Sequence, residues 1–247
     1  MSESFRPVSN TRTNSLLGKL KFHGRMVLDL QILTIFRHLK ELLPSLRGRV
    51  LDVGCGQSPY RFLLSPGAAE YKGIDIPDAN NKFDYQNPDV TPFDGETIPF
   101  EANAFDGVIC TEVLEHVAHY QRLVDEMLRV TKPGGRVIST IPWSARYHYI
   151  PFDFFRYTPS ALRRIFAGFA QVEIRPRGSD IAVIANKMIV LWFRHLLPRK
   201  PARLVFVPVW LVLSPILIVA VACAHLSFFL KWGSDEDPLG YTVIATK

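Results

Sequence analysis

The chain has 247 residues, of which 48% are hydrophobic and 21% charged, and its formal net charge is +6. This length is sufficient for one α/β domain with a full core and some additions. Three widely separated cysteines, Cys55, Cys110 and Cys223, exclude a disulfide framework and a cysteine metal cluster, so we expect a reducing compartment and no bound metal.

The first 47 residues predict a polar, mobile N-terminus over 1–15 and a helical cap over 16–47. Residues Leu16–Leu46 form one predicted helix that ends near Pro44. Its apolar residues recur at helical spacing: Val27, Leu30, Ile32, Leu33, Ile35, Phe36, Leu39, Leu42 and Leu43.

A strand followed by a glycine turn comes next, in the sequence Val-Leu-Asp-Val-Gly-Cys-Gly at residues 50–56. Glycine lets the backbone approach a ligand closely, and the turn aims amide N–H groups at it, so we expect a nucleoside-type cofactor. Pro59 stands where a dinucleotide fingerprint needs glycine, which opposes a nicotinamide enzyme. The next strand ends at Asp75, whose carboxylate suits a ribose diol.

Strands and helices then alternate along the chain. This order predicts an α/β fold with a parallel sheet and right-handed crossovers, and a ligand at the carboxyl ends of the strands. The predicted strands are Arg49–Val53, Tyr71–Ile76, Phe105–Cys110, Gly135–Thr140 and Ala170–Arg175, with a helix over Pro159–Phe166.

Five further segments follow the glycine turn in a characteristic order: Asp94–Phe100, Asn103–Cys110, Glu112–His116, Leu128–Gly135 and Arg136–Thr140. This ordered set resembles the class I S-adenosylmethionine-dependent methyltransferases, in the small-molecule branch that includes quinone- and lipid-methylating enzymes. The resemblance covers 48–177 and resumes at Tyr241–Thr246. It implies a Rossmann-like seven-stranded methyltransferase sheet, a domain over 48–180 and 238–247, and S-adenosyl-L-methionine as cofactor.

The resemblance also implies roles for particular residues. The loop residues would hold the methionine moiety, Asp75 the ribose and Asp94 the adenine, and Thr111 and Glu112, which follow the strand Phe105–Cys110, would line the cofactor near the transferring methyl group. The complete predicted cofactor set is Asp52, Gly54, Cys55, Gly56, Asp75, Ile76, Asp94, Gly95, Thr111 and Glu112. Glu115 and His116 are interpreted as packing or capping residues. The leading helix would lie across the substrate entrance, as in similar enzymes, or pack on the sheet.

An aromatic segment over Ile141–Tyr157 leaves the carboxyl end of the predicted strand Gly135–Thr140 and holds seven aromatic residues. Aromatic side chains with a few polar groups are typical of an acceptor pocket. His148 is the candidate general base, with Asp153 or Tyr157 in support. The alternative is a lid held by aromatic packing and an Arg156–Asp153 pair.

The last distinctive segment is apolar. Leu204–Leu230 contains no Asp, Glu, Lys or Arg and is long enough for a membrane span, but Pro208 and Pro215 interrupt it. The predicted final strand must return to the same sheet, so both ends of this insertion, 181–237, lie in one compartment. We therefore expect a helical hairpin that dips into one leaflet and contacts the membrane through 181–232.

The charge distribution favours the same interpretation. Residues 1–48 and 174–247 each carry a net charge of +5, whereas 49–173 carry −4. Basic flanks beside apolar segments favour an anionic leaflet over nucleic acid, which is not expected as a partner. The sequence thus predicts a membrane-associated methyltransferase whose catalytic domain faces the cytoplasm and O-methylates a small or lipid-linked acceptor.

Two alternatives remain open at this point. One is a soluble methyltransferase acting on a cell-surface sugar precursor, with the apolar segment forming a homodimer interface. The other is a non-catalytic membrane scaffold, because Ser58 replaces a third glycine that the family loop often carries.

Overall fold

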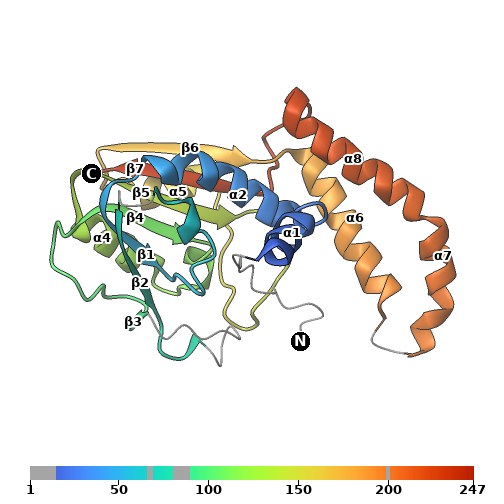
Figure 1. Cartoon of the computed structure of the whole chain (residues 1–247), viewed down its shortest axis with the longest axis horizontal. Helices are drawn as coiled ribbons and strands as arrows, with labels where there is room; N and C mark the ends of the chain where they lie inside the picture. The colour runs from blue at the N-terminus through green and yellow to red at the C-terminus, as the bar shows by residue number, and fades with distance from the viewer. Residues whose placement is uncertain (1–14, 66–68, 80–89, 199–200) are drawn as a thin grey trace.

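The computed structural model describes residues 15–65, 69–79, 90–198 and 201–247. The predicted mobile N-terminus therefore lies, apart from residue 15, outside the described residues. A seven-stranded sheet forms the centre of the molecule (Figure 1), with the strand order β3-β2-β1-β4-β5-β7-β6. The strands are β1 Gly48–Val53, β2 Ala69–Asp75, β3 Thr91–Pro92, β4 Phe105–Thr111, β5 Thr131–Pro142, β6 Gln171–Arg177 and β7 Gly240–Thr246.

Strands β1 to β5 run parallel to one another, and β7 lies antiparallel between β5 and β6. This arrangement confirms the predicted Rossmann-like seven-stranded sheet. It also brings the carboxyl ends of β1, β2 and β4 to one edge, where a ligand is expected in such folds.

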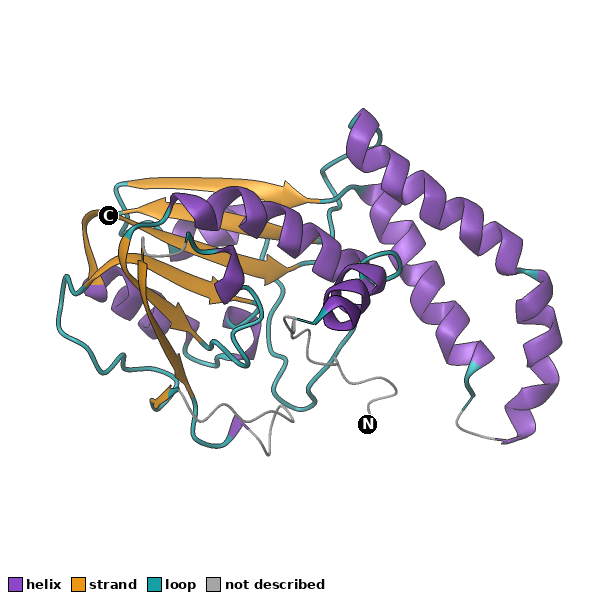
Figure 2. Ribbon diagram, viewed as in Figure 1, coloured by secondary structure: helices purple, strands orange, loops and turns teal. Residues whose placement is uncertain are grey.

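Helices cover both faces of the sheet (Figure 2). The described helices of this domain are α1 Leu16–Arg25, α2 Leu30–Leu42, α4 Tyr120–Val130 and α5 Pro159–Ile165, with 3-10 turns η1 Leu43–Ser45, η2 Arg61–Leu63 and η3 Leu114–His116. On β4, Val108 and Cys110 pack with α4 and α5, whereas the intervening Ile109 packs with α1 and α2. This alternation follows from the two-residue period of a strand.

The single helix predicted over Leu16–Leu46 is wrong, because the chain forms α1 and α2 with a turn between them. Asp29 starts α2 by accepting a hydrogen bond from the Ile32 N–H at 3.2 Å, and Arg25 pairs with the same carboxylate at 3.0 Å. The apolar pattern continues through Met26, Val27 and Leu28, so the pattern alone gives no sign of the break.

Between β6 and β7 the chain forms a helical extension that projects away from the sheet (Figure 1). It consists of α6 Asp180–Leu196, η4 Pro201–Phe206, α7 Val207–Val212 and α8 Ser214–Leu230. Buried residues of α6 and α8 pack together and against Leu30 of α2. At the base, Asp180 N–H donates to the Ser234 carbonyl and the Asp180 Oδ1 accepts from the Ser234 N–H, both at 3.0 Å.

Among the described helices, none is alone long and apolar enough to cross a membrane. Pro201–Val212 and Ser214–Leu230 reach that length and hydropathy only together, as a pair bent by 59°.

Candidate active site

The loop after β1 is shaped by two glycines in the left-handed region, Gly54 at φ 65° and Gly56 at φ 53°. A Cβ on Gly54 would lie 2.5 Å from the Val113 side chain, so a larger residue does not fit there. The Gly56 N–H donates to Asp75 Oδ2 at 2.8 Å, which ties the loop to the end of β2. Ser58 itself adopts φ 52°, so this loop takes a glycine-like conformation without a third glycine.

Asp52, the last but one residue of β1, and Asp75, the last residue of β2, are both buried and lie beside this loop on neighbouring strands. The Tyr71 hydroxyl donates to Asp52 Oδ2 at 2.7 Å and lies 2.8 Å from the Ser58 hydroxyl. Burial raises the pKa of Asp52 to about 7, although the Tyr71 hydrogen bond opposes the shift. The edge of the sheet therefore holds two carboxyl groups that differ in their hydrogen-bonding environment.

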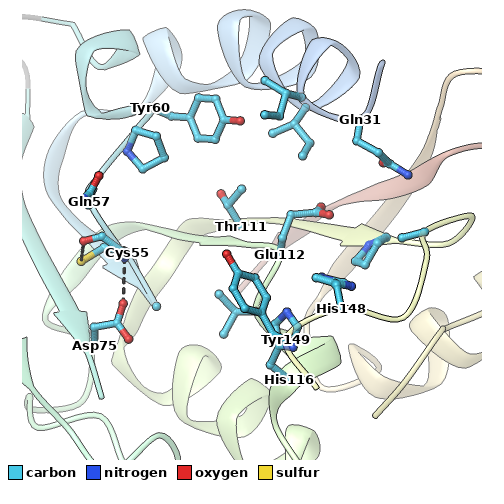
Figure 3. Close-up of a pocket in the computed structure, with 18 of the residues that line it drawn as sticks. Gln31, Cys55, Gln57, Tyr60, Asp75, Thr111, Glu112, His116, His148 and Tyr149 are labelled. Carbon is cyan, nitrogen blue, oxygen red and sulfur yellow. Dashed lines mark hydrogen bonds between the residues drawn. The ribbon is translucent and has the colours of Figure 1, made fainter. Parts of the chain in front are cut away.

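A cavity of about 1220 Å³ opens over these strand ends (Figure 3). All ten residues of the predicted cofactor set line it: Asp52, Gly54, Cys55, Gly56, Asp75, Ile76, Asp94, Gly95, Thr111 and Glu112. In Figure 3, Cys55 and Asp75 lie on one side, His116 and His148 on the other, and Thr111 and Glu112 between them. The volume exceeds the roughly 300–1,000 Å³ of common ligand pockets, so it has room for a nucleoside cofactor and a second molecule.

The donor set fits S-adenosylmethionine. The left-handed glycines let the loop backbone at residues 54 and 56 face the cavity without side chains, and the Asp75 carboxylate lies at the end of β2, where a ribose diol can be bound. Asp94 forms a local turn, accepting the N–H groups of Glu96 at 2.8 Å and Thr97 at 2.6 Å. These two N–H groups hold its pKa below the usual range, so Asp94 presents an ionised carboxylate at the rim.

Glu112 is held by a buried arginine that the sequence analysis missed. Glu112 lies just after β4 at φ 53°, and Arg177, whose side chain is fully buried, donates to its Oε1 at 2.8 Å. The same guanidinium contacts Thr34 Oγ1 and the Tyr241 carbonyl, both at 3.3 Å, and the Ile141 carbonyl at 3.2 Å. Arg177 therefore connects α2, β5, β6 and β7 to one carboxylate of the cavity.

The predicted catalytic residues separate into two groups. His148 lines the cavity, and its Nδ1 lies 3.0 Å from Asp153 Oδ2, so the structure brings these two together. Burial alone would raise the pKa of Asp153, but hydrogen bonds from Arg156 and His148 lower it below its usual range. The predicted Arg156–Asp153 pair is also present, at 2.8 Å.

Tyr157 is different, and the structure does not support its predicted role. Its side chain is buried in the core, its hydroxyl donates to the Leu114 carbonyl at 3.0 Å, and it does not line the cavity. The ring packs edge-on against Tyr120, which accounts for its place in the aromatic segment.

The side of the cavity away from the glycine loop is walled by helices that come from both ends of the chain. Helices α1 and α2 contribute Arg25 and Gln31, and α6 of the extension contributes Asn186, Lys187 and other residues. Figure 3 places Gln31 across the cavity from His148. The leading helices thus pack on the sheet, as one interpretation of that segment expected, and they also border the cavity, whereas their place across a substrate entrance stays a prediction.

Glu115 and His116, interpreted from sequence as packing residues, lie beside His148. Glu115 is fully buried, and this burial together with Glu112 raises its pKa well above the usual range. Burial and the neighbouring His148 lower the pKa of His116 to about 4. The sequence signal that could have revealed this cluster is the Glu-His pair soon after β4, together with a histidine in the aromatic segment.

Comparison with known proteins agrees with this geometry. Residues 51–139 match the family described as a methyltransferase domain. An uncharacterized methyltransferase of Mycobacteroides abscessus is 36% identical over 104 residues, 38% of this chain and 40% of that protein. A ubiquinone biosynthesis O-methyltransferase of Coxiella burnetii is 35% identical over 106 residues, 39% of this chain and 45% of that protein. The chain thus spans less than half the length of these relatives.

Two solved structures share the fold. An S-adenosylmethionine-dependent methyltransferase from Archaeoglobus fulgidus superposes with a TM-score of 0.53 at 20% identity, covering 95% of this chain and 100% of that one. The [4+2]-cyclase SpnF superposes with a TM-score of 0.51 at 19% identity, covering 88% and 81%. Residues 51–139 are therefore similar to a methyltransferase domain, and the chain shares its fold with S-adenosylmethionine-dependent methyltransferases.

Proposed function

We propose that this chain is an S-adenosylmethionine-dependent methyltransferase that methylates an oxygen of a small or lipid-linked acceptor at a membrane surface. The observation that carries the proposal is the continuity of one cavity. It begins at the glycine loop, passes Thr111 and Glu112, and ends against α6 of the helical extension. Cofactor and acceptor would therefore meet in one enclosed space, and the acceptor would enter beside the extension.

On the cofactor side, each residue has a binding task. The loop at Gly54 and Gly56 and the Asp52 carboxyl would hold the methionine moiety, Asp75 the ribose hydroxyls, and Asp94 the adenine amino group. S-adenosylmethionine, when bound, supplies an activated methyl group. The walls at Thr111 and Glu112 would orient the acceptor for in-line approach, because positioning is the main contribution that this reaction needs.

On the acceptor side, the extension supports an apolar or lipid-linked substrate. The outer surfaces of η4, α7 and α8 expose large hydrophobic side chains, including Val205 at 70%, Val212 at 78% and Phe229 at 79%. Residues 181–234 contain six Lys or Arg and no Asp or Glu. An exposed apolar surface with basic residues is typical of association with an anionic leaflet. The catalytic domain would then face the cytoplasm, with both ends of the extension on one side.

The test of methyl transfer compares lipid and aqueous extracts of cells that carry the gene with those of cells that lack it. We expect a lipid-fraction compound that is heavier by one CH₂ group only when the gene is present. A difference confined to the aqueous fraction would favour a soluble sugar precursor as the acceptor. If neither fraction differs and calorimetry detects no binding of S-adenosylmethionine, the chain is not this enzyme. That result would favour the non-catalytic membrane scaffold.

The proposed membrane association is tested separately, by flotation of the protein with vesicles of phosphatidylcholine and phosphatidylserine. Val205→Asp and Val212→Asp, combined in one chain, should reduce flotation, because each places a charge on the exposed apolar surface. Phe62→Asp, which changes a partly exposed aromatic residue on η2, is the control and should float as the wild type does. Equal flotation of both variants, or none by the wild type, would contradict association through the extension.

A further inference from the structure

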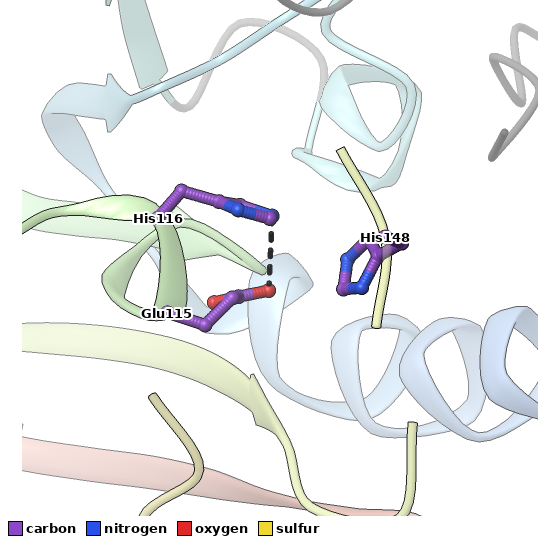
Figure 4. A group of neighbouring side chains, drawn as sticks. All are labelled: Glu115, His116 and His148. Carbon is purple, nitrogen blue, oxygen red and sulfur yellow. Dashed lines mark ion pairs between the residues drawn. The ribbon is translucent and has the colours of Figure 1, made fainter. Parts of the chain in front are cut away.

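Three side chains converge beside the acceptor half of the cavity: Glu115 and His116 from η3, and His148 from the segment after β5 (Figure 4). One potential ligand atom from each lies within 4.8 Å of the others. Glu115 Oε1 lies 3.6 Å from His116 Nε2, and the two imidazole rings have centroids 5.0 Å apart. We propose that these residues form a binding site for a divalent transition-metal ion, with Zn²⁺ as the reference ion.

The first observation behind this proposal is the state of Glu115. Its side chain is fully buried, and neither carboxylate oxygen has a hydrogen-bond partner among the described residues. Arg156, whose charge acts on Glu115, is hydrogen-bonded to Asp153 at 2.8 Å. A buried carboxylate without hydrogen bonds is costly in a folded protein, and a bound cation is one of the few groups that satisfies it.

The second observation is the orientation of the two imidazoles. His116 Nδ1 lies 2.6 Å from the Phe152 carbonyl, and His148 Nδ1 lies 2.9 Å from the Arg146 carbonyl and 3.0 Å from Asp153 Oδ2. These oxygens accept hydrogen bonds, so each ring carries its proton on Nδ1 and its lone pair on Nε2. Histidines that bind metal ions are held in the same way, by a carbonyl or carboxylate on the other nitrogen.

The donor set indicates the class of ion. Two imidazole nitrogens and one carboxylate oxygen suit zinc and other first-row divalent ions, whereas magnesium and calcium prefer oxygen ligands throughout. Three protein ligands leave at least one coordination position open in a catalytic zinc site. His116 and His148 both line the cavity, so that position would face the space proposed for the acceptor.

This assignment changes the interpretation of His148. A nitrogen that binds an ion cannot also take up a proton, so His148 would act as a ligand and Asp153 as the residue that positions it. Within the proposed methyltransferase, an acceptor hydroxyl bound to the ion would become more acidic and would release its proton to water. Metal binding itself does not depend on methyl transfer.

The experiment uses the purified full chain after dialysis against EDTA. Calorimetric titration with Zn²⁺ should show one ion per chain, and titration with Co²⁺ should produce visible d–d absorption bands. Glu115→Gln and His148→Ala should each weaken binding by more than the roughly 10–100-fold that losing an outer-shell partner costs. His119→Ala, an exposed histidine three residues from His116, is the matched control and should bind as the wild type does.

A second measurement separates loss of the site from loss of the fold. Zn²⁺ should raise the thermal midpoint of the wild type and of His119→Ala, but not that of Glu115→Gln. Without metal, Glu115→Gln should be at least as stable as the wild type, because the substitution removes a buried carboxylate that lacks a partner. Absence of Zn²⁺ and Co²⁺ binding by the wild type, or undiminished binding by Glu115→Gln and His148→Ala, would overturn the proposal. Binding of S-adenosylhomocysteine is measured in parallel, because its loss would count against the proposed function and not against the metal site.

Discussion

Replacing Arg177 by methionine tests whether its buried guanidinium organises the cavity. Arg177 is fully buried and forms an ion pair with Glu112 at 2.8 Å. Removing one member of a buried pair typically costs about 3–5 kcal/mol, because the other charge is left uncompensated. The Glu112 side chain is 25% exposed, and water relieves part of that penalty. We therefore expect Arg177→Met to lower the free energy of unfolding by about 3 kcal/mol, at the lower end of that range.

The chain offers a matched control two residues earlier on β6. Arg175 forms exposed ion pairs with Glu173 at 2.7 Å and Glu41 at 2.8 Å. Exposed pairs contribute about 0–1 kcal/mol, so Arg175→Met should change the stability by no more than that. Urea unfolding, followed by tryptophan fluorescence and extrapolated linearly to water, measures both variants.

A double-mutant cycle isolates the charge effect. In the Glu112→Gln background no carboxylate is left unpaired, so Arg177→Met should cost less there by about 1.5 kcal/mol or more, within the range found for residues in contact. If Arg177→Met and Arg175→Met cost the same, or if the Arg177 and Glu112 substitutions are simply additive, the proposed role of this buried pair is wrong.

Three further substitutions test the cofactor side of the cavity. Asp75→Ala should weaken binding of S-adenosylhomocysteine in calorimetry by about 1.5–3 kcal/mol, the range for hydrogen bonds to charged groups, and wild-type affinity would contradict the ribose assignment. Gly54→Ala should lower the thermal midpoint and cofactor affinity, since its Cβ would meet Val113 at 2.5 Å, whereas Gly24→Ala, with nothing within 4 Å, should keep cofactor affinity. Burial raises the pKa of Asp52 from its ordinary value of 3.8 to about 7 in the folded chain, so ionisation of Asp52 destabilises the folded chain progressively as pH rises between these values. Urea unfolding should show Asp52→Asn gaining about 2–3 kcal/mol over the wild type from about pH 5 to pH 8, and a pH-independent difference would refute the shift.

The cofactor half of the cavity could be predicted from sequence because its signals are local. The short strand Gly48–Val53 leads directly into Gly54, and the next strand ends on Asp75, so both residues can be placed from their neighbours in sequence. The order of strands and helices then fixed the edge of the sheet where these residues meet.

The rest depends on contacts between distant parts of the chain. Arg177 ends an ordinary-looking strand, and its partners lie as far away as Thr34 and Tyr241, so nothing beside it in sequence marks it as buried. His148 meets Glu115 only because the segment after β5 folds back over η3. Tyr157 belongs to the same aromatic segment as His148 but faces the core, since composition alone does not give the direction of a side chain.

The reciprocal hydrogen bonds between Asp180 and Ser234 have a consequence for protein engineering. They bring the two ends of a segment of more than fifty residues within hydrogen-bonding distance of each other, at 3.0 Å. A short turn could therefore replace everything between these two residues without moving β6 or β7. Such a shortened chain would need polar replacements for Leu30 and Leu239, which α6 and α8 now cover. It would separate the sheet and its glycine loop from the exposed apolar helices, at the cost of the cavity wall that α6 provides.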